Sequence, residues 1–365
     1  TNIKSPKHLF AFQNDPFKST IKFWSEDETE TTYDYSGGAN VADAYDYRKL
    51  GESWSAPRII RIKHNNNDKW VAVVGGGYNS GVNPNYGSAV FVIDLEDGGK
   101  VLKRIDITDS ASSNIVNSVP ADLAVITADG TEKANYNGGL VYVADLEGKI
   151  TKINLTDQGT MYQQTTLFNS QSNTSNGRML FHKPEATIKD SKLWMYFGSG
   201  NIQKLQDQSS NIKNRLYGIK DKDFPNFVAI NSAGTIANCK TGNNCPTNSD
   251  LGWYIDLDKS KKVTAEPTVD KDLVYFPVYE PKSLSNACET GDAILYSANT
   301  TCGKATQTKL GKGALTKVVI QDGNLVVGIS GEVEKGLQSK DNLISLKSTQ
   351  KAQQKLTIEG WKENF

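Results

Sequence analysis

The sequence predicts an all-β protein, a modified β-propeller built from four-stranded antiparallel blades. Short apolar runs recur along the chain, turns rich in glycine and asparagine separate them, and almost no window has helical periodicity. The runs return at an irregular spacing of roughly 50–80 residues, which is typical of propeller blades. The 365 residues fit one domain, residues 1–365, with about five full blades and part of another.

The repeating unit is clearest between Trp54 and Leu95. We expect a first strand at Ala56–Ile62, a valine-rich second strand at Lys69–Gly75 and a third strand at Ala89–Leu95. The asparagine turn His64–Asp68 separates the first two strands, because asparagine tolerates left-handed backbone. Three glycines follow the second strand, where the chain can turn sharply without a Cβ penalty.

The same order recurs four more times. Predicted first strands begin near a proline, in Ser55-Ala56-Pro57, Val119-Pro120-Ala121, Lys183-Pro184-Glu185 and Glu266-Pro267-Thr268. Predicted second strands are Trp70–Gly75, Leu140–Ala144, Leu193–Gly198, Leu273–Val278 and Leu325–Ile329. Predicted third strands are Ala89–Leu95, Lys149–Leu155, Arg215–Lys220, Ala293–Ala298 and Asn342–Leu346. Candidates for the fourth strand are Val101–Ile107, Trp253–Leu257 and Lys355–Trp361.

The first residues depart from this order. His8–Phe12 and Ile21–Trp24 resemble the third and fourth strands of a blade, and we expect residues upstream of Thr1 to complete the ring in a longer parent protein. Val41–Leu50 is the best candidate for a short helix.

Two segments are predicted insertions: residues 29–50, acidic and tyrosine-rich, and residues 201–249, long and polar. Long loops on a rigid scaffold often carry recognition. We therefore predict partner contacts through four tyrosines, which offer large contact area at low entropic cost: Tyr33, Tyr35, Tyr45 and Tyr47. Four tryptophans are expected to pack between blades: Trp54, Trp70, Trp194 and Trp253.

Composition excludes some function classes. Lysine plus arginine and aspartate plus glutamate both number 41, so the formal net charge is zero and no surface for nucleic acid is indicated. No apolar run is long enough for a transmembrane helix, which needs about 20 residues.

The four cysteines, Cys239, Cys245, Cys288 and Cys302, lie in loop-like sequence. Four cysteines allow three pairings, and the sequential one, Cys239 with Cys245 and Cys288 with Cys302, is favoured. The spacing lacks the CxxC pattern and nearby histidine of a zinc site. Disulfides indicate an exported protein.

Catalytic motifs find little support. The three histidines, His8, His64 and His182, have no second ligand or catalytic partner nearby in sequence. No Gly-x-Ser-x-Gly elbow occurs, and Gly75-Gly76-Gly77 is not followed by the lysine of a P-loop. A quinone-dependent oxidoreductase is the chief enzymatic alternative, but no two cysteines are adjacent as that chemistry usually requires. We predict a protein that is not an enzyme.

Several motifs stand in order along the chain: Leu50–Pro57, Lys69–Val73, Gly75–Ser80, Val90–Leu95, Val141–Lys149, Met195–Gly200, Leu216–Ile219 and Gly252–Leu257. Together they resemble the C-terminal domain of type IV pilus tip-associated proteins of the PilC/PilY type. The resemblance implies a modified propeller, export to the bacterial surface, and a place at the pilus tip or outer membrane. It also implies support of pilus biogenesis by opposing retraction, contacts with minor pilins or other pilus subunits, and adherence to a host-cell receptor. A lectin domain acting alone is the alternative.

The resemblance also implies a calcium site, since the family commonly holds Ca²⁺ in an aspartate-rich loop before the strand matching Leu140–Asp145. Without gaps, the ligand positions fall on Thr131, Lys133, Asn135 and Gly139, and a lysine at a ligand position cannot hold Ca²⁺. A displaced site formed by Asp122, Asp129, Asn135 and Asn137 stays open. The carboxylates of Asp94, Glu96 and Asp97 are better explained by an exposed turn.

Overall fold

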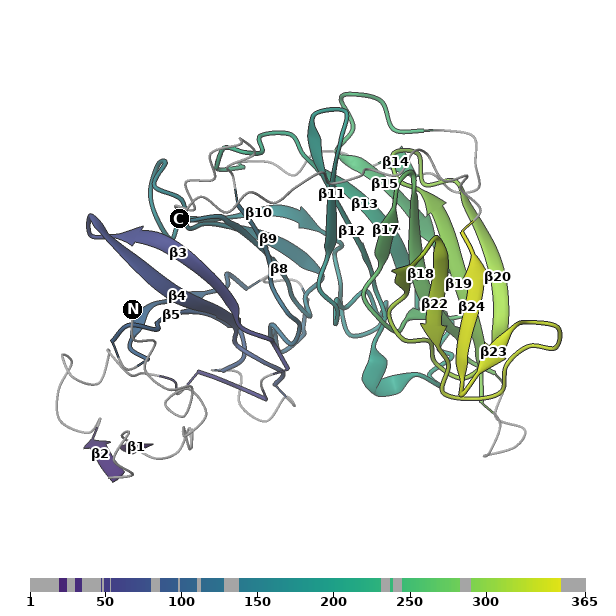
Figure 1. Cartoon of the computed structure of the whole chain (residues 1–365), viewed down its shortest axis with the longest axis horizontal. Helices are drawn as coiled ribbons and strands as arrows, with labels where there is room; N and C mark the ends of the chain where they lie inside the picture. The colour runs from purple at the N-terminus through teal and green to yellow at the C-terminus, as the bar shows by residue number, and fades with distance from the viewer. Residues whose placement is uncertain are drawn as a thin grey trace.

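A computed structural model of the chain describes residues 20–24, 30–34, 47, 49–52, 54–79, 86–97, 99–109, 113–127, 138–230, 237–238, 245–282 and 290–348. Within these residues, five sheets of four or five strands follow one another in chain order, antiparallel except at the edge strand of the third, and we number them blades 1 to 5. Figure 1 shows them fanned out from β3–β5 on one side to β20–β24 on the other. The predicted all-β propeller is confirmed.

The first two blades are simple meanders. Blade 1 consists of β3 (Arg58–His64), β4 (Asn67–Gly75), β5 (Ala89–Asp94) and β6 (Val101–Asp106). Blade 2 consists of β7 (Ala124–Ile126), β8 (Leu140–Ala144), β9 (Lys149–Asn154) and β10 (Gln164–Asn169). In both, each strand pairs with the next one along the chain.

The later blades are more elaborate. Blade 3 has β11 (Glu185–Lys189), β12 (Lys192–Gly198), β13 (Arg215–Asp221), β15 (Gly252–Asp256) and a parallel edge strand, β14 (Ala237–Asn238). Blade 4 has β16 (Lys262–Val263), β17 (Thr268–Asp270), β18 (Leu273–Glu280), β19 (Asp292–Asn299) and β20 (Ala305–Lys312). Blade 5 has β21 (Val319–Gln321), β22 (Asn324–Gly328), β23 (Ser339–Lys340) and β24 (Leu343–Lys347). A 3₁₀ turn, η2 (Ile202–Lys204), lies between β12 and β13.

Several predicted strands, insertions and one predicted helix differ from the structure. β1 (Thr20–Trp24) pairs with β2 (Glu30–Asp34), which lies inside the predicted insertion 29–50. β13 divides the other predicted insertion, 201–249, into two loops. In blade 5 the fourth position belongs to β23, which precedes β24 in the chain, while Lys355–Trp361 and His8–Phe12 lie outside the described residues. The described end of the predicted helix Val41–Leu50 is not helical.

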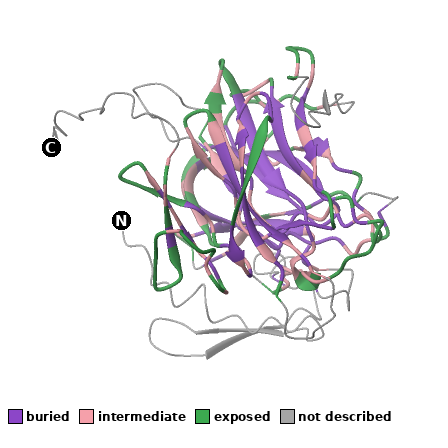
Figure 2. Ribbon diagram, turned by 90° about the vertical axis from the view of Figure 1, so that its right-hand side faces the viewer, coloured by how far each residue is buried: buried purple, intermediate pink, exposed green. Residues whose placement is uncertain are grey.

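The core lies between blades rather than within them. Four apolar clusters each combine side chains from two successive blades: blades 1 and 2, 2 and 3, 3 and 4, and 4 and 5. Figure 2, viewed from the blade 5 side, shows the buried strands filling the middle of the molecule. Burying one large apolar side chain contributes about 1.5–3 kcal/mol, so face-to-face stacking is the main stabilising interaction.

The tryptophans divide into two groups. Trp194 and Trp253 are buried between blades 3 and 4, as predicted. A Cβ at Gly218 would lie 2.3 Å from the Trp253 ring, so the ring requires glycine there. Trp54 and Trp70, in contrast, are 49% and 42% exposed, so the prediction that they pack between blades is wrong. No helix in the described part of the chain is long and apolar enough to span a membrane.

Candidate functional site

The proline motifs found in the sequence lie together at one end of the propeller. Pro57, Pro120 and Pro184 precede the first strands of blades 1 to 3, Pro267 precedes β17 of blade 4, and charged residues close to these prolines meet at that end. We call it the axial end. Proline fixes φ and lacks an N–H, which suits the position just before a strand at the edge of a sheet.

Six charged side chains from all five blades form an axial charge cluster at this end: Arg58, Asp122, Lys183, Glu185, Glu266 and Lys317. Arg58 Nη2 lies 3.2 Å from Asp122 Oδ2, and Lys183 Nζ lies 3.5 Å from Glu266 Oε2. Lys317 Nζ reaches Glu266 at 2.9 Å and Glu185 at 3.4 Å. Lys317 of blade 5 therefore links blades 3 and 4 at this end.

The cluster is electrically balanced, with three cations facing three carboxylates. Burial disfavours the charged form of Glu266, yet the hydrogen bond from Lys317 and the charge of Lys183 leave the pKa of this carboxyl below its usual value. A hollow of about 260 Å³ beside the cluster is lined by Arg58, Lys183, Glu185 and apolar residues of β7.

An exposed aromatic stack lies beside the cluster. The ring of Trp54 stacks on that of Tyr78, with centroids 5.2 Å apart and planes 8° from parallel, and Tyr78 contacts Phe181 at 6.1 Å. Backbone hydrogen bonds in both directions join Tyr78 to Glu52, and Gly77, at φ +88°, lets the chain turn there. The stack is therefore held rigidly while Trp54 stays half exposed. Sequence reasoning missed it, although the serines flanking Trp54 were a signal that it lies outside an apolar run.

The predicted partner-binding tyrosines are not assembled into such a surface. Tyr47 is only 2% exposed, stacks on Phe91 at 5.8 Å, and donates a hydrogen bond from its hydroxyl to the Gly99 carbonyl at 2.5 Å. The prediction for Tyr47 is wrong, because its ring covers the outward apolar face of blade 1. Tyr33 lies on β2, whose backbone alone is described, and Tyr35 and Tyr45 lie outside the described residues.

The cysteine pairing also differs from the favoured one. Cys245 forms a disulfide with Cys302, 57 residues away, with Cα atoms 4.4 Å apart. The sequential pairing is therefore wrong, because the long loop of blade 3 reaches the β19–β20 turn of blade 4. Asn299 positions that turn by accepting hydrogen bonds from the N–H groups of Thr301 and Cys302. Cys239 and Cys288 lie outside the described residues.

Of the four proposed calcium ligands, the structure describes only Asp122; Asp129, Asn135 and Asn137 lie outside it. Asp122 accepts hydrogen bonds from the Ala56 N–H and from Arg58. It lies at the axial end of β7, whereas the segment holding the other three follows the opposite end of that strand. No three His, Cys, Asp or Glu side chains gather as a metal site in the described ranges. A calcium site in the segment after β7 stays a prediction.

Comparisons with known proteins agree with this architecture. No family model matches the chain. It is 26% identical to a type IV pilus biogenesis factor PilY1 homolog from Xylella fastidiosa, over 70% of this chain and 19% of that protein. Its fold matches the crystal structure of the Pseudomonas aeruginosa PilY1 C-terminal domain with a TM-score of 0.55 and 15% identity, covering 86% of this chain and 77% of that one.

The chain has the fold of the PilY1 C-terminal domain and resembles PilY1-type proteins in sequence. The chain spans about a fifth of the length of the Xylella relative. A quinohemoprotein alcohol dehydrogenase from Pseudomonas putida is more distant, with a TM-score of 0.41 and 10% identity over 77% of this chain and 39% of that one.

Proposed function

We propose that this PilY1-type domain supports type IV pilus biogenesis, opposing retraction, and surface adherence by binding minor pilins and other pilus proteins at its axial end. On this proposal it works outside the cell, at the pilus tip or outer membrane, and performs no catalysis. The name of the Xylella relative supports the link to pilus biogenesis. The disulfide supports an oxidising compartment.

The observation that carries the proposal is the exposed Trp54–Tyr78 stack beside the axial charge cluster. Tryptophan and tyrosine are the residues that most often dominate protein interfaces, because they bury much area while fixing few rotamers. Here Tyr78 and its backbone bonds already hold the Trp54 ring, so little ordering remains to oppose binding. The neighbouring ion pairs supply a polar rim of both signs, which favours orientation and register.

The test is binding of purified minor pilins to the domain, measured by biolayer interferometry. Trp54→Ala should weaken binding at least tenfold, about 1.4 kcal/mol, with little change in melting temperature. Trp70→Ala is the matched control, since Trp70 is similarly exposed but lies on β4, and it should leave binding unchanged. Wild-type affinity in Trp54→Ala, or no pilin binding by the wild type, would contradict the proposal. Strong hits on a glycan array without pilin binding would favour the lectin alternative.

A further inference from the structure

A second, more enclosed hollow lies apart from the axial charge cluster, and we call it the Lys262 pocket. It has a volume of about 210 Å³ and lies between the loop preceding blade 3, the loop between β12 and β13, and β16. Its polar lining comes from these three segments, with Thr174, Ser175, Asn201, Asp207, Asn214 and Lys262. Amide and hydroxyl groups surround Lys262, the one buried cation, while the exposed side chains of Lys204 and Asp207 add one charge of each sign to the lining.

Lys262 is 1% exposed, and its Nζ donates hydrogen bonds to the Asp207 carbonyl at 2.6 Å and the Ser260 carbonyl at 2.9 Å. An ammonium group has three N–H donors, so two carbonyls leave one for another acceptor. In the described part of the chain no carboxylate lies within 4 Å of this Nζ, unlike the neighbouring Lys261, which pairs with Asp258 and Glu280. A buried cation that touches no carboxylate is costly, and the charge of Asp207 offsets that cost only in part, so the pocket is suited to an anion.

The walls of the pocket are fixed by their own hydrogen bonds. Asn173 Oδ1 accepts from the N–H groups of Ser175 and Asn176, at 3.0 and 2.9 Å. Asn201 Oδ1 accepts from the Gln203 N–H at 3.0 Å, where it caps η2. A pocket with such preformed walls loses little conformational entropy when a ligand binds.

We propose that the Lys262 pocket binds a small, hydroxyl-rich carboxylate of the size of a single uronic acid. The ligand carboxylate would accept the third N–H of Lys262, and the surrounding Asn, Ser and Thr groups would bond its hydroxyls. The volume is below the roughly 300–1,000 Å³ of pockets for drug-sized ligands, which limits the occupant to about one sugar ring. This site is separate from the Trp54–Tyr78 stack, so either proposal can fail alone.

The experiment is calorimetric titration of the domain with D-galacturonate and with D-galactose, which differ in having a carboxylate or a CH₂OH group. Galacturonate should bind at pH 7 at least tenfold more tightly than galactose. Lys262→Met should abolish this preference, whereas Lys204→Gln, which removes an exposed lysine from the same lining, should retain it. Circular dichroism and melting temperature establish that each variant is folded.

A second measurement needs no variant. Burial lowers the pKa of Lys262 to about 8, and the charge of Asp207 opposes that effect only in part. Binding of a carboxylate should raise this pKa, so titration at pH 8 in buffers of different ionisation enthalpy should show proton uptake. Lys204 and Asp207 are the other titratable side chains of the lining. Equal affinity for the two sugars, no binding of galacturonate by the wild type, or binding without proton uptake would overturn the proposal.

Discussion

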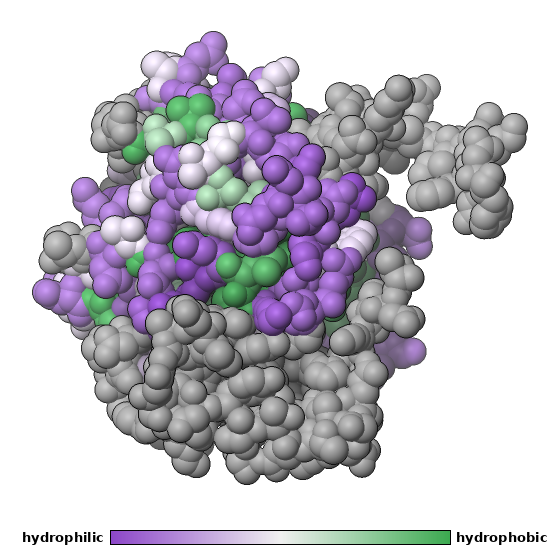
Figure 3. All heavy atoms as spheres, turned by 90° about the vertical axis from the view of Figure 1, so that its left-hand side faces the viewer, coloured by the Kyte–Doolittle hydropathy of each residue, from purple (hydrophilic) through white to green (hydrophobic). Residues whose placement is uncertain are grey.

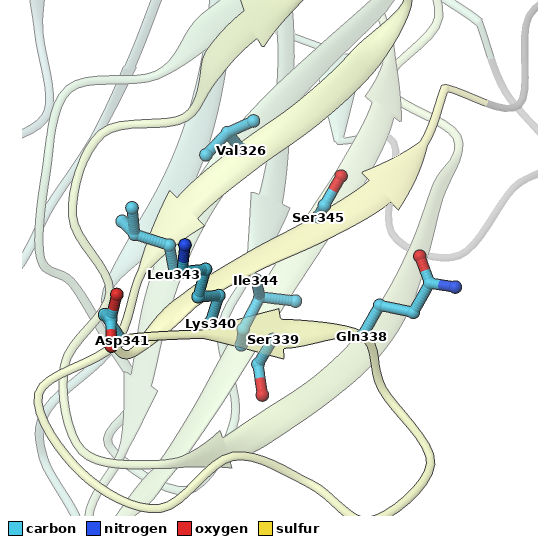
Figure 4. Close-up of a pocket in the computed structure, with 8 residues that line it drawn as sticks. All are labelled: Val326, Gln338, Ser339, Lys340, Asp341, Leu343, Ile344 and Ser345. Carbon is cyan, nitrogen blue, oxygen red and sulfur yellow. The ribbon is translucent and has the colours of Figure 1, made fainter.

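Blades 2 and 3 bury their facing sheets against each other, whereas the outward face of blade 5 is exposed. Between blades 2 and 3, Asp221 accepts hydrogen bonds from Lys152 at 2.6 Å and from the Tyr142 hydroxyl at 2.7 Å, and the side chains of Lys152 and Asp221 are completely buried. On blade 5, Val319 and Leu343 are 58% and 52% exposed. Leu343 lines a groove of about 470 Å³ (Figure 4).

The outward face of blade 1 lies between these extremes. Tyr47 covers its centre, while Ile59 remains 62% exposed near Trp70. Figure 3 faces this end of the molecule and shows apolar residues interspersed among polar ones. An apolar strand pattern therefore places a residue on a face of a blade. Whether a neighbouring blade covers that face then determines how much the residue contributes to stability.

The largest effect should come from Asp221→Ala. It leaves the buried ammonium of Lys152 without its counter-charge, and breaking a buried ion pair typically costs about 3–5 kcal/mol. Urea denaturation should show this loss in the free energy of unfolding. The double variant Lys152→Met with Asp221→Leu should recover most of it, because no buried charge remains. A loss below about 1 kcal/mol in Asp221→Ala would mean that the junction is not held as described.

Removing the disulfide should have the next largest effect. Cys245→Ser releases a loop closed over 57 residues, and the chain-entropy model assigns such a closure about 4 kcal/mol, of which about 2–4 is usually observed. Denaturation without reductant measures the loss. If the cysteines outside the described residues also pair, thiol titration of the unfolded wild type should find no free thiol. Peptide mapping that joined Cys245 to Cys239 would contradict the pairing.

Acid should weaken the axial end through His182. Burial lowers the pKa of His182 to about 4, so the unfolded chain takes up a proton first as the pH falls. Stability should therefore be lost between about pH 6.5 and pH 4, by about 2–3 kcal/mol relative to His182→Gln. Burial raises the pKa of Asp145 to about 6, and because that acts equally in both proteins it cancels in the difference. The prediction would be wrong if the wild type and His182→Gln lost the same amount of stability between pH 6.5 and pH 4.

The smallest effect should come from the uncovered face of blade 5. Leu343→Ala should change stability by less than about 0.5 kcal/mol, since the side chain is half exposed. Its neighbour on the same strand, Ile344, is fully buried against blade 4, and Ile344→Ala should cost about 2–5 kcal/mol. Equal losses in the two variants would show that the blade 5 face is covered in solution.

Most second and third strands could be predicted from sequence because they are buried on both faces and therefore appear as continuous apolar runs. Leu140–Ala144 was predicted to the residue for β8. Outer strands such as β20 are half exposed and polar, ATQTKLGK, so their sequence resembles loops. β16 is only two residues long and is separated from β17 by Pro267. The sequence alone therefore could not show that β16 pairs with β18.

The site was harder to predict because it depends on contacts between distant segments. The proline motifs were visible, but nothing in the sequence showed that Lys317 would meet Glu185 and Glu266. Tyr47 was misjudged because an acidic, polar surrounding suggested exposure, whereas one aromatic ring was needed to cover the blade 1 face. The disulfide was misjudged because distance along the chain is a poor guide when a long loop crosses to the next blade.

The Cys245–Cys302 bond has a mechanical consequence. It encloses β15 and most of blade 4 in a covalent lasso, so a tensile load applied at the two termini cannot extend the 57-residue separation it spans. Pulling the oxidised domain in a single-molecule experiment should release a contour length shorter by about 200 Å than pulling the reduced one. Strands inside the lasso are shielded from force even after the outer blades have unravelled.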